Sequence, residues 1–384
     1  MTAYNRTWLD ALRIRDIAGE WHTQGLFDDA KWQVIQERHP SNFYSPNIFV
    51  RAGLAFFSLI LLTAAIGLFA LFFGAESDAG FGALAIFFGV LALLLLEFWS
   101  IRSARHFGSG VDDMLLYFGT GCIITGLCAP LPYDAGELTY YCIAWPFLAA
   151  GSIRYLDRAM TAAAYVCSLL ILLSFVERVP NLAVYLLPFT GILFSAAVYL
   201  LARRGQGMHT LRHWHKQLGL LELLALVTLY LSGNYWVVQQ AAFDLYQLER
   251  LPLGWFFWAF TFGMPAAFIF AGLQQKDRLL LDVGLGAIAG AVFTFRYYFH
   301  VLPWEWAAVA GGAILFATAY FSIRYLRANE GAYTYAADGD ATLLQEIEEQ
   351  LIEQTIASQS PPVPVKKEGF DGGQFGGGGA GTEF

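Results

Sequence analysis

Charged residues are scarce in this chain: only 14% of its 384 residues are Asp, Glu, Lys or Arg, while 57% are hydrophobic and 16% are aromatic. Soluble globular domains carry about 25% charged residues, so this composition excludes a single soluble domain. Apolar runs of about 20 residues recur along the chain instead, which is the length that crosses a bilayer as a helix. The sequence therefore predicts an all-α fold, a polytopic transmembrane helical bundle.

Features of enzymes and of nucleic-acid-binding proteins are also missing. The chain has no P-loop, no G-x-S-x-G and no H-E-x-x-H. Its formal net charge of -8 disfavours nucleic acid as a partner. The four cysteines, Cys122, Cys128, Cys142 and Cys167, fall inside apolar runs without C-x-x-C spacing, which is typical of small buried hydrophobes. We therefore expect no cofactor, no metal site and no enzymatic activity.

Ten apolar runs have the length of a span. Their centres lie near Leu59, Val90, Ile123, Pro146, Leu169, Gly191, Val227, Phe262, Ile288 and Ile314. The run around Pro146 is short and holds a proline, which spans tolerate because neighbouring helices satisfy the backbone groups that proline leaves free. We expect a transmembrane domain of about ten spans over residues 47–326.

Lys and Arg are unevenly distributed among the connections between these runs. Every second connection is basic, as at Arg102 and Arg105 or at Arg203 and Arg204, and the intervening connections hold one basic residue or none. Cytoplasmic loops carry such an excess of Lys and Arg. No cleavable signal peptide is visible, because the first apolar run starts only near Ile48. The pattern predicts a multi-pass protein of the bacterial inner membrane, surrounded by membrane lipid, with both termini in the cytoplasm.

Residues 1–46 predict a short cytoplasmic helical hairpin. Apolar residues recur at helical spacing along its first half, and Gly25 then supplies a stop. Asp28 or Asp29 can cap a second helix, which Pro40 ends. A unit this short cannot hold a large core. We therefore expect its aromatic residues to pack on the membrane domain or on a partner.

The same region carries a family resemblance. The stretch IAGEWHTQGLFDDAKWQVIQER followed by VRAGLAFFSLILLTAAIGLF resembles the start of the predicted-membrane-protein family catalogued as domain of unknown function 2157. In that family a Trp-x-x-x-Gly hairpin precedes many hydrophobic spans. The family has no established activity, so the resemblance implies an architecture and no functional residues.

The segment after the last span divides into two predicted parts. Residues 338–358 predict an acidic amphipathic helix whose apolar stripe includes Leu344, Ile347 and Leu351. The anionic inner leaflet repels an acidic helix, so the stripe should meet a protein surface; an exposed helix without a partner is the alternative.

Residues 359–384 predict a proline linker and a disordered Gly/Phe-rich tail, because a glycine run has too little apolar area to offset its ordering entropy. The tail resembles the glycine-rich C-termini of TPM-domain proteins at bacterial membranes, but it ends in Phe384 in place of Trp. Phe370, Phe375 and Phe384 are candidates for docking a protein partner. A passive spacer is the alternative.

Two acidic residues lie well inside the apolar runs. Ionisable residues within a bilayer are costly and are functional candidates by default. Glu222 and Asp282 both enter from the cytoplasmic side to a similar depth, so on neighbouring helices they would form a proton or cation site. The alternative is separate pairing of Glu222 with Lys216 and of Asp282 with Arg278, or snorkelling of these side chains to the membrane interface.

The outer halves of the same runs hold a polar and aromatic group that includes Asn234, Arg296 and Glu305. This group is a candidate ligand site facing outward. An aromatic belt at the membrane interface, with an ordinary Arg296–Glu305 ion pair, is the alternative.

These observations favour a non-enzymatic platform or sensor that docks partners through its cytoplasmic ends. The alternative is a secondary carrier for a small solute or ion that uses the intramembrane carboxylates. An intramembrane enzyme is the least supported function, because no pair of nucleophile and base stands out.

Overall fold

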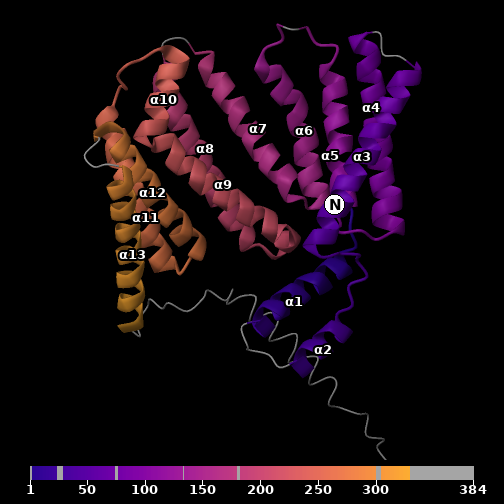
Figure 1. Ribbon diagram of the computed structural model, residues 1–384, viewed down its shortest axis with the longest axis horizontal. Coiled ribbons are helices and arrows are strands. Elements are labelled where there is room, and N and C mark those ends of the chain that lie inside the picture. Colours follow the sequence, from indigo (N-terminus) through magenta and orange to yellow (C-terminus); the bar gives the residue numbers. More distant parts are fainter. Residues whose placement is uncertain are drawn as a thin grey trace, which may run out of the picture. The chain divides into compact units, whose positions relative to one another are not determined.

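The computed structural model describes residues 2–23, 29–73, 77–132, 134–179, 182–299 and 304–328 (Figure 1). These ranges are almost entirely helical and contain no strand beyond one isolated bridge between Tyr44 and His106. The all-α helical bundle that the sequence predicts is therefore confirmed. The predicted helix 338–358 and tail 359–384 lie outside the described residues, together with their candidate docking residues Leu344, Ile347, Leu351, Phe370, Phe375 and Phe384.

Two helices precede the apolar ones, α1 (Arg6–Thr23) and α2 (Asp29–Arg38). Their bounds agree with the two helices predicted within residues 1–46, and Asp29 opens the second. An extended segment follows α2 and reaches α3 (Ile48–Phe73).

The remaining elements follow in chain order. They are α4 (Asp78–Leu94), which continues as the π-helix η1 (Leu95–Ser103), α5 (Val111–Cys128), α6 (Glu137–Tyr155), α7 (Arg158–Glu177), α8 (Ala183–Gln206), the 3₁₀ helix η2 (His209–Trp214), α9 (His215–Gly233), α10 (Tyr235–Tyr246), α11 (Gly254–Gln275), α12 (Arg278–Phe299) and α13 (Trp304–Ala328). Each of the ten predicted span centres falls inside one of these helices.

Eight of the described segments are long and apolar enough to cross a membrane. The other two predicted spans are α6, which contains Pro146, and α13, whose apolar stretch Gly311–Phe321 is shorter. Large apolar side chains such as Phe56, Leu193 and Phe270 are exposed along the helices, as lipid contact requires. The protein is a multi-pass helical membrane protein.

Helices consecutive in the chain form the closest pairs: α4 with α5, α6 with α7, α8 with α9 and α11 with α12. Glycines bring α4 and α5 together. A methyl group at Gly82 would lie 2.7 Å from the carbonyl oxygen of Gly126, and one at Gly89 would lie 2.8 Å from that of Gly119. Such small residues let backbones approach closely where apolar burial cannot drive association within lipid.

The sequence did not predict α10. Asn234 ends α9 and begins α10, because its side-chain Oδ1 accepts hydrogen bonds from the backbone N–H groups of Trp236 and Val237. This is an N-cap, one of the strongest local signals for a helix start. The sequence left the aromatic residues after Asn234 open between a ligand site and an interface belt, and the structure places Tyr235 and Trp236 in the first turn of α10.

Candidate functional site

Ala3 and Tyr4, which lie just before α1, pack into the bundle. Tyr4 is buried in a core with Leu96, Leu115 and Met160, and the backbone N–H of Ala3 donates to the carbonyl of Arg154 at 2.9 Å. Burial and, secondarily, the carboxylate of Asp112 raise the pKa of Tyr4 well above its ordinary value, so its phenol stays neutral. The N-terminal segment therefore packs on the membrane domain, which is one of the two outcomes the sequence predicts.

An aromatic cluster continues this contact. The ring centroid of Phe43 lies 5.3 Å from that of Trp8 and 5.0 Å from that of Phe107. The guanidinium of Arg105 lies 5.2 Å from the Trp8 ring centroid, within cation–π distance. Because Phe107 belongs to the connection between η1 and α5, the cluster joins α1 to that end of the bundle.

Two ion pairs join α1 to η2 and to the start of α9. Asp10 accepts a hydrogen bond from Arg212 in η2 at 2.7 Å, and Asp16 accepts one from Lys216 at 2.7 Å. Each pair links residues about two hundred positions apart, namely 202 and 200. Lys216 is thus paired with the N-terminal helix, whereas the sequence had offered Glu222 as its partner.

Charge reversal at the first of these pairs should release α1. In Asp10→Arg we expect the backbone amides of α1 to exchange faster, because two cations would then face each other at Arg212. A half-exposed pair contributes about 1 kcal/mol at most, so the change should be roughly five-fold. Hydrogen–deuterium exchange with mass spectrometry measures it. The double variant Asp10→Arg with Arg212→Asp should restore the slow exchange, and a failure to restore it would show that the pair does not hold α1.

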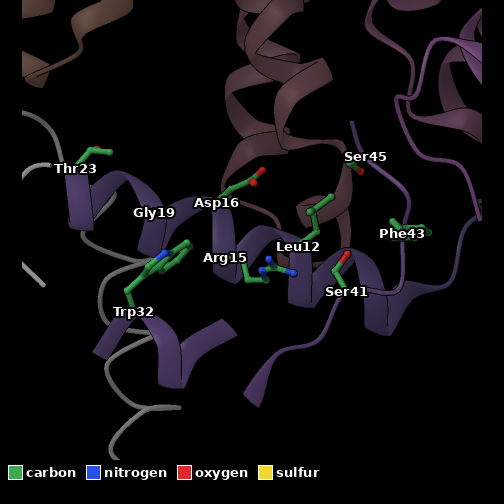
Figure 2. A pocket seen from close by; sticks show the side chains of 9 residues that line it. All are labelled: Leu12, Arg15, Asp16, Gly19, Thr23, Trp32, Ser41, Phe43 and Ser45. Atoms are coloured by element: carbon green, nitrogen blue, oxygen red, sulfur yellow. The ribbon is translucent and has the colours of Figure 1, made fainter. Parts of the chain in front are cut away.

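A groove of about 530 Å³ lies between α1, α2 and the extended segment, and we call it the α1–α2 groove. It is lined by Leu12, Arg15, Asp16, Gly19, Thr23, Trp32, Ser41, Phe43 and Ser45 (Figure 2). Figure 2 shows Trp32 beneath Gly19 at one end of the groove and Ser41, Phe43 and Ser45 at the other. Its lining combines apolar surface with one charge of each sign, so it suits an amphipathic guest.

The extended segment lines one side of the groove with every second residue. Ser41, Phe43 and Ser45 alternate along it, so they lie on one face as in a strand. Tyr44 lies between them. Its backbone N–H donates to the carbonyl of Arg105 at 2.9 Å, and its backbone carbonyl accepts from the N–H of Phe107 at 3.3 Å. Among the described residues, the backbone N–H groups of Phe43 and Ser45 make no hydrogen bond to another backbone group.

The other end of the groove is rigidly held. The Trp32 ring lies against Gly19, where a methyl group would be 3.4 Å from the ring. The His22 ring stacks on Trp32 at 5.8 Å between centroids, and His22 Nε2 lies 2.8 Å from a carboxylate oxygen of Asp29. These contacts fix α2 against α1.

The membrane domain holds a second polar site around Glu222 in α9. Glu222 is 4% exposed, and its Oε1 atom is buried without a hydrogen-bond partner. The charged groups that act on it are Arg203 of α8 and Asp277, which precedes α12. Arg203 donates to Asp277 at 2.5 Å and to the Tyr199 hydroxyl at 3.0 Å.

Asp282 lies apart from this site. Its side chain is 65% exposed and lies 3.7 Å from Arg278, which is the separate pairing that the sequence offered as the alternative. Arg203, which acts on Glu222, pairs with Asp277 instead. The sequence analysis did not single out Asp277. The sequence feature that could have identified Asp277 is its position directly before a helix. Its Oδ1 atom caps α12 by accepting a hydrogen bond from the backbone N–H of Leu279 at 2.9 Å.

In the outer polar group, both the Oδ1 and the Nδ2 atoms of Asn234 make hydrogen bonds within the protein. Asn234 is 2% exposed, and its Nδ2 donates to the Tyr230 hydroxyl and to Thr294 Oγ1, each at 3.0 Å. Arg296 has a buried Nη1 atom without a hydrogen-bond partner. The side chain of Glu305 lies outside the described residues, so its predicted pairing with Arg296 stays a prediction.

Comparison with known proteins returned no relatives. No family model matches the chain, and no curated protein or solved structure matches it. Within the described residues, no group of three or more His, Cys, Asp or Glu side chains is placed to hold a metal ion. The two resemblances drawn from the sequence stay predictions.

Proposed function

We propose that this multi-pass membrane protein is a non-enzymatic platform that docks an extended peptide segment of a partner protein in its α1–α2 groove. The observation that carries the proposal is the groove itself, held against the bundle by the Tyr4 core, the aromatic cluster and two ion pairs.

The chemistry of the groove supports an extended peptide as the guest. Leu12, Trp32 and Phe43 offer apolar surface for one or two large side chains. The backbone N–H groups of Phe43 and Ser45 can pair with a peptide main chain, which is how edges of extended segments bind peptides. Arg15 and Asp16 then select for opposite charges on the guest.

Asp16 also supports a sensing role. It lines the groove and at the same time accepts the hydrogen bond from Lys216 in the first turn of α9. A basic side chain of a docked peptide would compete with Lys216 for this carboxylate. Docking and the position of α9 are coupled in this proposal, with the groove and both termini on the cytoplasmic side of a bacterial inner membrane, as the distribution of Lys and Arg predicts.

Site-specific photocrosslinking in living cells tests the proposal. With p-benzoyl-phenylalanine at Ser41, inside the groove, we expect one adduct of defined mass whose cross-linked peptide is an extended segment. With the same probe at Glu37, exposed on α2 outside the groove, we expect none.

A matched pair of substitutions completes the design. Leu12→Ala should weaken the Ser41 adduct about ten-fold, as the loss of a contributing apolar contact of about 1.4 kcal/mol would do. Glu37→Ala should leave it unchanged. Equal adducts from both probe positions, or indifference to Leu12→Ala, would exclude docking in the groove.

A secondary carrier for a small solute or ion is the second candidate function. It is favoured by one observation, the burial of the Glu222 carboxyl within a candidate span. The exposure of Asp282 counts against the two-carboxylate form of that hypothesis.

A further inference from the structure

The contacts of Glu222 reveal no structural role for its carboxyl group. Glu222 lies seven residues into α9, so it is about 10 Å along the helix from His215. Glutamate is almost never fully buried unless it is paired. Its buried Oε1 nevertheless accepts no hydrogen bond, and the nearest candidate cation in sequence, Lys216, is held by Asp16.

Within the described part of the chain, the guanidinium that acts on Glu222 is that of Arg203, and its Nη1 atom already donates to other groups. Arg203 uses Nη1 for both Tyr199 and Asp277. Asp277 in turn uses one carboxylate oxygen for Arg203 and the other for the backbone of α12. With both carboxyl groups ionised, Arg203, Asp277 and Glu222 would carry a net charge of -1 inside the membrane domain, and one added proton would make the group neutral.

The surroundings favour a proton over a metal ion. A metal cation needs several oxygen ligands, whereas Glu222 presents a single buried unpaired oxygen. The Arg203 guanidinium would also repel a metal cation. A proton needs one carboxylate oxygen and no coordination shell.

We propose that Glu222 is an intramembrane proton-binding site, whose occupancy decides how strongly Arg203 holds Asp277. With the proton bound, Glu222 is neutral and Arg203 pairs with Asp277 alone. When the proton leaves to bulk water, the Glu222 carboxylate competes with Asp277 for the same guanidinium. This inference does not depend on docking in the α1–α2 groove.

The three residues in this competition belong to different helices or turns. Arg203 belongs to α8, Glu222 to α9, and Asp277 to the turn between α11 and α12. The Arg203–Asp277 pair therefore joins the α8–α9 pair to the α11–α12 pair, and deprotonation of Glu222 loosens that connection. Of the helices packed on α9, α7 contributes Tyr165, whose hydroxyl donates to the carbonyl of Leu224 at 3.5 Å. Helix α8 contributes Arg203 and Tyr199, and the α11–α12 turn contributes Asp277. On α12, Arg278 and Asp282 are exposed and pair with each other.

Infrared difference spectroscopy on the full-length protein in lipid nanodiscs tests this proposal. Between acidic and alkaline buffer we expect a carbonyl stretch at the high-frequency edge of the carboxyl region, where protonated carboxyls without hydrogen-bond partners absorb. The band should be absent in Glu222→Gln, which keeps the size of the side chain. It should persist in Asp282→Asn, the matched control on an exposed carboxyl.

Asp277→Asn provides a second, independent readout. It frees the guanidinium of Arg203 for the Glu222 carboxylate, so the band should be lost at a lower pH than in the unsubstituted protein. This shift carries the test if Glu222→Gln fails to fold. A band that remains in Glu222→Gln, or a titration that is the same with and without Asp277→Asn, would overturn the proposal.

Discussion

Gly126→Ala should destabilise the protein by about 1–3 kcal/mol, although it adds a single methyl group and improves helix propensity. The added methyl would lie 2.5 Å from the carbonyl oxygen of Gly82 and 2.6 Å from the side chain of Ile86. Neither the helix backbone at Gly82 nor the packed Ile86 can yield without separating α4 from α5. The measurement is the free energy of unfolding in mixed micelles titrated with sodium dodecyl sulfate.

Gly121 in the same helix provides the matched control. A methyl group there would meet no atom within 4 Å. Gly121→Ala should therefore leave the free energy of unfolding unchanged or raise it slightly, since alanine favours helix over glycine. If both substitutions had the same effect, close packing of α4 on α5 would not be the cause.

Asn234→Ala should lower the free energy of unfolding by about 2–4 kcal/mol, because it removes a helix cap and two buried hydrogen bonds together. The cap acceptor serves Trp236 and Val237, and the amide group serves Tyr230 and Thr294. Asn234→Asp keeps the cap acceptor but loses the amide donors, so it separates the two contributions. The same unfolding titration measures both variants.

An exposed hydrogen bond on α10 gives the comparison. Gln240 donates to Asp244 at 3.0 Å on the exposed side of the helix. Gln240→Ala should change the free energy of unfolding by less than about 0.5 kcal/mol, as exposed substitutions do. An Asn234→Ala effect of that same small size would mean that the α9–α10 junction is not stabilised by this side chain.

The spans were predictable because one physical requirement dominates them. A bilayer needs about 20 apolar residues per crossing, and that requirement is local in sequence. Each predicted centre, from Leu59 to Ile314, accordingly falls inside a helix. The helix α10 was missed because it is too short to span, and its start depends on the Asn234 cap.

The polar sites were only partly predictable. Glu222 was recognisable because an acid stands out in an apolar run, but its neighbours depend on how helices pack. The choice between Asp277 and Asp282 rests on which residue caps α12 and which lies on an exposed face. The pairs Asp10–Arg212 and Asp16–Lys216 join residues so distant in sequence that no local pattern reveals them.

That distance sets an order of assembly during biosynthesis. Residues of α1 leave the ribosome well before those of α9, yet the core that receives Tyr4 includes Met160, and the partners of Asp10 and Asp16 follow later still. Helix α1 must therefore wait outside the membrane until α9 has been made before it can take its final position. Helix α1 therefore takes its final position only after helices that follow it in the chain, so its docking reports that those helices, up to α9, have been inserted and packed.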